Sequence, residues 1–97
     1  MLSYMIKTYA NKATEQIANG EVPKRVEKQL AQKALMRLVQ IDNAVELKDL
    51  RFPQSNRLEK LHRERKGQHS IRINDQWRIC FKFKSGDFYD VEFTDYH

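Results

Sequence analysis

The spacing of apolar residues changes once along the chain, from a helical period to a strand period. Val26, Leu30, Ala34 and Leu38 recur every four residues, which is the spacing of one helix face. From position 71 onwards apolar residues alternate with polar ones, as they do along a half-buried strand. Helices followed by strands predict an α+β fold, with N-terminal helices packed on a mainly antiparallel sheet.

Capping residues and prolines predict where the N-terminal elements begin and end. Residues 6–10 have the composition of a short first strand. Asn11 is the expected N-cap of a short helix, and Asn19-Gly20 its C-terminal stop. Pro23 suits the first turn of the second, longer helix.

A further helical turn is predicted after the long helix. Asn43 and Glu46 have the spacing of a capping box, which predicts helical structure through Leu50. Phe52-Pro53 should end this turn, because the residue before a proline avoids the α region.

Three consecutive strands are predicted in the C-terminal half, and residues 57–61 are expected to add another before them. The first two should form a hairpin around residues 74–76, with one apolar face made of Ile71, Ile73, Trp77, Ile79, Phe81 and Phe83. A turn at residues 85–87 leads to the third strand, whose apolar face is expected to hold Tyr89, Val91 and Phe93.

The opposite face of this predicted sheet is polar and mostly cationic, since the alternation places on it Ser70, Arg72, Arg78, Cys80 and Lys82. The residues expected to bind phosphate groups are Lys60, Arg65, Lys66 and Arg72. Guanidinium groups bind phosphate in a forked, bidentate way. A solvated loop is the alternative explanation for the charges of residues 63–67, which should project from one sheet edge.

Composition favours a polyanionic partner. The chain has 97 residues, the size of one domain spanning residues 1–97, and its net charge is +5. Nucleic acid, the ribosome or an acidic protein would suit this charge. The sequence has one cysteine, no apolar run of ~20 residues and no signal-peptide pattern. These features predict a cytoplasmic protein that does not enter a membrane.

No metal or cofactor is expected. His62, His69, His97 and Cys80 lack zinc-site spacing, and neither clustered carboxylates nor a Gly-rich phosphate loop is present. Cys80, in mid-strand between apolar residues, is expected to fill space rather than act as a nucleophile.

The C-terminus carries side chains suited to RNA chemistry. Asp95, Tyr96 and His97 directly follow a predicted strand. A tyrosine can stack on a base, and a histidine can transfer a proton near neutral pH. A frayed, functionless tail is the alternative.

Three stretches of the chain resemble the HigB-type toxins, the plasmid-maintenance-killer branch of the RelE superfamily. They are residues 56–61, 65–81 and 90–97, and the terminal Asp-Tyr-His after a Trp-Arg strand is a specific signature of the family. The N-terminal part agrees more loosely, through the Met-Ile-Lys of residues 5–7 and the helix layout.

The resemblance implies a RelE-like microbial-RNase fold and a toxin of a type II toxin–antitoxin system. It implies a metal-independent endoribonuclease that cleaves mRNA in the 30S decoding site of the ribosome, where the RNA 2′-hydroxyl attacks the adjacent phosphate. The implied partner is a HigA-type helix-turn-helix antitoxin, with operator DNA bound only through the antitoxin complex.

The resemblance also assigns roles to residues. Arg78 matches the family's arginine after tryptophan and should contact the scissile phosphate, while Asp95, Tyr96 and His97 match the catalytic C-terminal trio. His62 stands where some members have a catalytic lysine, and Glu59 where some have a histidine. Those members' acid–base pair is therefore not reproduced, and His62 is the candidate substitute. The alternative is a non-catalytic basic module that binds RNA or a protein partner.

Overall fold

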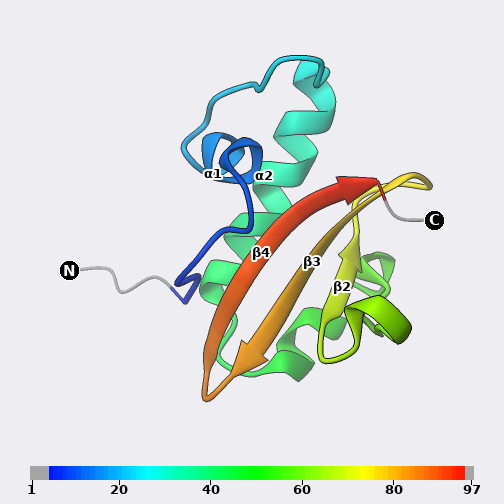
Figure 1. Cartoon of the computed structure of the whole chain (residues 1–97). Helices are drawn as coiled ribbons and strands as arrows, with labels where there is room; N and C mark the ends of the chain where they lie inside the picture. Colours follow the sequence, from blue (N-terminus) through cyan, green and yellow to red (C-terminus); the bar gives the residue numbers. More distant parts are fainter. Residues whose placement is uncertain (1–4, 96–97) are drawn as a thin grey trace.

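The computed structural model describes residues 5–95. Two helices precede an antiparallel sheet with strand order β1-β2-β3-β4 (Figure 1), which confirms the predicted α+β class. In chain order the elements are α1 (Lys12–Ala18), α2 (Lys28–Asn43), η1 (Leu47–Arg51), η2 (Gln54–Asn56), β1 (Glu59–Lys60), η3 (Arg63–Arg65), β2 (His69–Arg72), β3 (Trp77–Lys84) and β4 (Asp87–Asp95), where η denotes a 3-10 turn.

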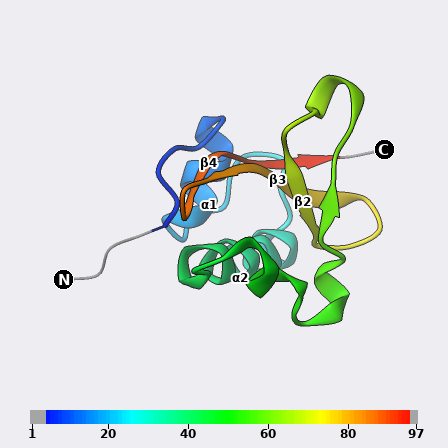
Figure 2. The same cartoon turned by 90° about the horizontal axis from the view of Figure 1, so that it is seen from below.

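The two faces of the sheet have different coverings. Helix α2 lies across one face, and the light-green segment that holds η3 stands on the other side (Figure 2). Leu38 and Ile41 of α2 are buried in the core with Phe81 and Phe88 of the sheet. The face away from α2, here called the open face, is therefore available for polar chemistry. Within residues 5–95 no helix has the length and apolarity needed to cross a bilayer.

Helix α1 has the predicted limits and is tied to the sheet by a buried threonine. The Asn11 side chain accepts a hydrogen bond from the backbone N–H of Thr14 at 2.9 Å, and Gly20 follows the helix with φ +86°, a conformation that glycine adopts at low cost. The Thr14 hydroxyl accepts a 2.9 Å hydrogen bond from the Phe93 N–H in β4.

Helix α2 begins later than predicted. Pro23 lies in the preceding loop, where its carbonyl accepts from the Val26 N–H at 3.2 Å. Arg25 has φ +66°, and this left-handed residue separates Pro23 from the helix, which starts at Lys28. The predicted apolar stripe is confirmed for Ala34 and Leu38, which are buried in α2 together with Ala31 and Ile41. Leu30 is only partly buried against the core, and Val26 lies before the helix.

The predicted helical turn through Leu50 is confirmed, but its capping box lies three residues later in the chain than predicted. Asn43 is the last residue of α2, and Glu46 is the N-cap of η1 with Asp49 as its partner. The Asp49 carboxylate accepts from the Glu46 N–H at 2.9 Å. The turn ends before Pro53, as expected.

The predicted first strand is reduced to two isolated parallel bridges with β4, from Ile6 to Phe88 and from Tyr9 to Val91. Between these bridges the Asp90 N–H donates to the Thr8 hydroxyl at 2.8 Å instead of to a backbone carbonyl. A side chain thus replaces the ladder bond that a continuous strand would need.

A bulge in β4 changes which residues face the core. Cys80 pairs with Glu92, but Lys82 pairs with Tyr89, so β4 contains one extra residue at this point. Asp90 takes it up with φ +51°. Phe88 and Val91 are therefore both buried, and the prediction that Tyr89 belongs to the apolar face is wrong, since Tyr89 shares the open face with Lys82.

The predicted β2–β3 hairpin is confirmed. Ile71 pairs with Ile79, and the Asn74 side chain accepts from the backbone N–H groups of Gln76 and Trp77, each at 2.8 Å. Trp77 stacks on Phe93 with ring centroids 4.4 Å apart. The extra strand expected within residues 57–61 is present only as the two residues of β1.

Candidate functional site

The Arg78 side chain lies on the open face and is held by two hydrogen bonds. Its Nε donates to the Ser70 hydroxyl and its Nη2 donates to the Arg57 carbonyl, each at 2.7 Å. Ser70 is fully buried, and Arg57 is in the left-handed region with φ +44°. The Arg78 side chain retains 11% exposure, so one part of the guanidinium is anchored while another part can meet a ligand.

Carboxylates accompany the cations of this face. Glu59 lies with its Oε2 3.8 Å from Arg78 Nη2, and its side chain is 55% exposed. Arg72 is the cross-strand neighbour of Arg78 and forms an ion pair with Asp75 in the adjacent turn. The carboxylates are the exposed members of both pairs, so an arriving phosphate can compete with them for the guanidinium groups.

The Arg65 side chain lies over the open face of the sheet and does not project from its edge. Its Nη1 lies 3.0 Å from Glu92 Oε1 and 3.0 Å from Gln68 Oε1. Glu92 is the cross-strand neighbour of Cys80, which places Arg65 on the open face. Lys66 follows η3 and is exposed. The expected projection of the loop charges holds for Lys66 and is wrong for Arg65.

The structure separates Lys60 from Arg78. Lys60 pairs with His69, and His69 pairs with Phe81 of the core. Directly opposed residues of an antiparallel sheet share a face, so Lys60 lies on the α2 side of the sheet edge. His62 is exposed and is the N-cap residue of η3.

The C-terminal trio is described only in part. Asp95 is the cross-strand neighbour of Trp77, and its Oδ2 accepts from Gln76 Nε2 at 2.8 Å. The predicted catalytic residues Tyr96 and His97 lie outside the described residues. Asp95 and Arg78 therefore lie on adjacent strands at the same end of the β3–β4 pair but on opposite faces of the sheet, because Asp95 is paired with Trp77 and Arg78 with Thr94.

Cys80 is buried, and burial raises the pKa of its thiol above the ordinary value. Nearby Arg65 lowers that pKa in part. We expect native protein to react with iodoacetamide near neutral pH far more slowly than unfolded protein, because the thiolate is the reactive form. Mass spectrometry with and without denaturant measures this, and equal labelling in both would contradict the burial.

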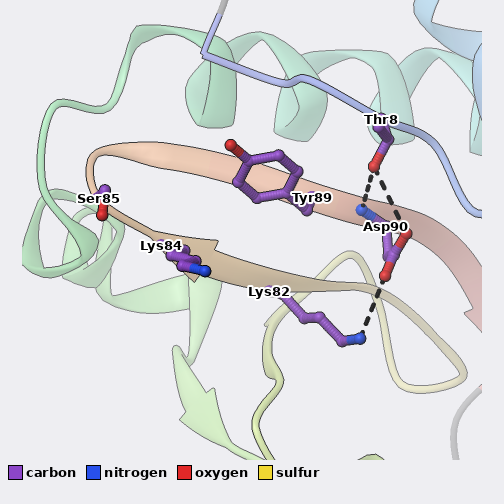
Figure 3. Close-up of a pocket in the computed structure, with 6 residues that line it drawn as sticks. All are labelled: Thr8, Lys82, Lys84, Ser85, Tyr89 and Asp90. Carbon is purple, nitrogen blue, oxygen red and sulfur yellow. Dashed lines mark hydrogen bonds and ion pairs between the residues drawn. The ribbon is translucent and has the colours of Figure 1, made fainter.

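A hollow of about 560 Å³ lies at the hairpin end of the open face, lined by Thr8, Lys82, Lys84, Ser85, Tyr89 and Asp90 (Figure 3). Lys82 Nζ lies 3.3 Å from Asp90 Oδ2, so one of the two lysines that line the hollow already has a counterion. Sequence reasoning missed this hollow because it depends on the bulge, which puts Tyr89 beside Lys82. Among residues 5–95 no three His, Cys, Asp or Glu side chains are grouped as a metal site would require.

Comparison with known proteins gives consistent results. The family model described as the RelE-like toxin of type II toxin–antitoxin system HigB matches residues 7–97. Endoribonuclease HigB of Proteus vulgaris is 34% identical over 93 residues, which cover 96% of this chain and 100% of that protein. Toxin HigB-1 of Vibrio cholerae serotype O1 is 34% identical over 83 residues, covering 84% of this chain and 87% of that protein.

Among solved structures, the YoeB–YefM complex from Staphylococcus aureus superposes with a TM-score of 0.62 and 20% identity, covering 98% of each chain. This likeness concerns the fold, and with the family match it confirms the RelE-like architecture. Membership in a toxin–antitoxin family also implies an antitoxin as partner. From the match over residues 7–97 and the full-length similarity to two HigB proteins, we conclude that the chain belongs to the HigB-like family of RelE-type toxins of type II toxin–antitoxin systems.

Proposed function

We propose that this toxin is a metal-independent endoribonuclease that cleaves mRNA in the 30S decoding site and so inhibits translation. The observation that carries the proposal is the family match over residues 7–97, joined to full-length similarity with the Proteus vulgaris endoribonuclease. The net charge of +5 and the arginines of the open face suit a ribosome and its mRNA.

The proposed reaction is an internal transfer within the RNA. The 2′-oxygen forms a bond to the adjacent phosphorus, the bond from phosphorus to the 5′-oxygen breaks, and a 2′,3′-cyclic phosphate and a 5′-hydroxyl result. A base takes the 2′-hydroxyl proton, and an acid gives a proton to the departing 5′-oxygen. Negative charge grows on the phosphoryl oxygens between these events.

Arg78 is the proposed partner of this growing charge. Its hydrogen bonds to Ser70 and to the Arg57 carbonyl hold the guanidinium before the substrate arrives. A donor fixed in advance loses little freedom in the transition state, which is how preorganised electrostatic groups accelerate reactions. Glu59 lies next to the guanidinium and must give way to the phosphate.

The remaining roles follow from the family signature. We assign proton transfer to His97 with His62 as the second candidate, nucleotide stacking to Tyr96, and positioning of its neighbours to Asp95. Arg65, Lys66 and Arg72 would anchor phosphates. The proposed antitoxin is a HigA-type helix-turn-helix protein, through which the complex would bind operator DNA, and the proposed site of action is the cytoplasm.

The direct test is expression without and with the antitoxin. We expect production of the chain alone to arrest growth, because an active toxin would halt translation, and co-expression of the cognate antitoxin to restore it. Mapping of mRNA 5′ ends should show new cuts inside reading frames. Normal growth with accumulating folded protein would contradict the proposal.

Dependence on the ribosome is a second prediction. We expect cleavage of an mRNA bound to ribosomes and little cleavage of the same RNA when naked, because the chain has few candidates for strong acid–base catalysis and ribosomal RNA would help to orient the substrate. A purified translation system with and without ribosomes measures both rates. Equal rates would show that the ribosome adds nothing.

One observation favours a different function. Carboxylates stand beside two of the arginines of the open face, as Glu59 does at Arg78 and Glu92 at Arg65. A module that binds RNA or an acidic partner without cutting could tolerate this arrangement. Growth arrest without new mRNA ends would support that alternative, whereas new ends that disappear on loss of His97 would exclude it.

A further inference from the structure

A second basic hollow, separate from the Arg78 site, lies at the β1 edge of the sheet. It has a volume of about 370 Å³ and is lined by Leu47, Lys48, Arg51, Leu58, Lys60 and His69. Turn η1 forms one wall, and β1 with the start of β2 forms the other. We call it the edge hollow.

The edge hollow and the Arg78 site are on opposite faces of the sheet. Register places Lys60, His69 and Phe81 in one row, and Phe81 is fully buried beneath α2. The adjacent row contains Glu59 and Ser70, which face Arg78 on the open face. A ligand in the edge hollow therefore cannot be the phosphate that Arg78 contacts.

The cations of the edge hollow are poorly neutralised. Arg51 and Lys60 form no ion pair within residues 5–95, and Lys48 has only the exposed contact to Glu46 at 3.3 Å. On the open face, by contrast, Lys82, Arg65 and Arg78 all have carboxylate neighbours. Of the three cations that line the hollow, only Lys48 has an acidic partner among the described residues, so the hollow keeps an excess of positive charge that an anion would offset.

His69 supplies an independent observation. Among the described residues its Nδ1 is buried and has no hydrogen-bond partner, while its ring stacks at 6.4 Å on Phe81. A buried polar atom without a partner is costly. Burial first, and the Lys60 ammonium second, lower the pKa of His69 below the ordinary value. An anion in the hollow would stabilise the protonated ring, so a bound anion should raise this lowered pKa.

We propose that the edge hollow binds a backbone phosphate of RNA, at a position outside the cleavage site. A phosphate carries its negative charge on several acceptor oxygens. Lys48 and Arg51 from η1 and Lys60 from β1 could therefore each contact a different oxygen of one phosphate. Leu47 and Leu58 give the hollow an apolar side on which a ribose can rest. The inference rests on the proposed function only in taking RNA as the polyanion. It gives the toxin a second RNA-binding site, on the face of the sheet opposite to Arg78.

The test uses the whole chain and a short single-stranded 2′-O-methyl RNA, which lacks the attacking hydroxyl and stays intact. We expect titration followed by ¹⁵N NMR of the His69 ring to show the pKa of His69 rising when the oligonucleotide binds, because a nearby anion stabilises the imidazolium. The double variant Arg51→Gln/Lys60→Gln should lose this rise. Its slope of log affinity against log salt should also fall by about 0.7 for one lost phosphate contact.

The matched control is Lys24→Gln/Lys33→Gln, which removes the same charge from exposed positions outside the edge hollow. It should keep the response of His69 to RNA. Arg51 and Lys60 are exposed too, so both double variants should melt like the parent chain.

Three results would overturn the proposal. The first is an unchanged pKa of His69 while RNA binds, and the second is a change with inorganic phosphate alone, which would indicate an adventitious ion only. The third is a change in the pKa of His69 with a glutamate-rich peptide where RNA causes none, which would make the hollow a binding site for an acidic protein. These readouts need no cleavage, so failure of the nuclease proposal would appear separately, as absent mRNA cutting.

Discussion

Replacing Arg78 with alanine should slow mRNA cleavage about 10²–10³-fold, the usual cost of losing a fixed donor that acts on transition-state charge. The reason lies in how the guanidinium is held. Ser70 and the Arg57 carbonyl orient it before substrate binds, so its contribution should appear mainly in the chemical step. Single-turnover cleavage at saturating ribosome isolates that step from association.

The same contacts mean that Arg78 also supports the sheet. Its loss leaves the buried Ser70 hydroxyl without this partner, and a hydrogen bond to a charged group contributes about 1.5–3 kcal/mol. Thermal melts must therefore accompany the kinetics. Ser70→Ala removes only the hydrogen bond between Ser70 and Arg78 and keeps the guanidinium group. We expect it to reduce the cleavage rate far less than Arg78→Ala.

Lys28→Ala/Lys33→Ala serves as the charge control. Both lysines are exposed on α2, and we expect their loss only to weaken ribosome association in a salt-dependent way. A folded Arg78→Ala protein that cleaves at the parental rate would refute the site. Arg78→Lys extends the test if the alanine variant unfolds, because it keeps the charge but cannot form the forked contact.

The sequence predicted the elements well where a local rule decides the outcome. The Asn11 cap, the Gly20 stop and the β2–β3 hairpin each depend on a few adjacent residues. The errors have a different origin. Arg25 and Asp90 adopt positive φ values, which residues other than glycine seldom do. Their residue types did not allow these backbone conformations to be predicted. One delays the start of α2, and the other moves Tyr89 to the open face.

Prediction of the site met a similar limit. Alternation alone placed Arg72 and Arg78 on one polar face, which the register confirms. A cluster of basic residues in the sequence carried no information about which sheet face each would occupy. Their closeness in the sequence suggests that Lys60 and Arg65 belong to one phosphate-binding surface. In the structure Lys60 lies on the α2 side of the sheet, whereas Arg65 lies over the open face. The carbonyl of Arg57 could not be foreseen either, because it depends on a left-handed backbone.

Replacing His97 with glutamine should lower the single-turnover cleavage rate about 10²–10⁴-fold, the range for removal of a general acid or base. Glutamine keeps the chain length and a polar end but cannot exchange a proton near neutral pH. The melting temperature should stay close to that of the parent chain, because the last residue of the described core cluster is Phe93. Tyr96→Phe offers a matched comparison, since it keeps a ring that can stack on a base.

A pH–rate profile separates proton transfer by His97 from a merely structural effect. Histidine is the side chain that ordinarily titrates between pH 5 and 8, so the parent enzyme should show an inflection there that His97→Gln lacks. His62→Gln is the decisive companion, because His62 is exposed beside η3 and is the other candidate. If His62→Gln removes the inflection and His97→Gln leaves it, the roles are reversed. If neither variant changes the rate or the profile, neither His62 nor His97 transfers a proton in this reaction, and catalysis would depend on Arg78 and the ribosome.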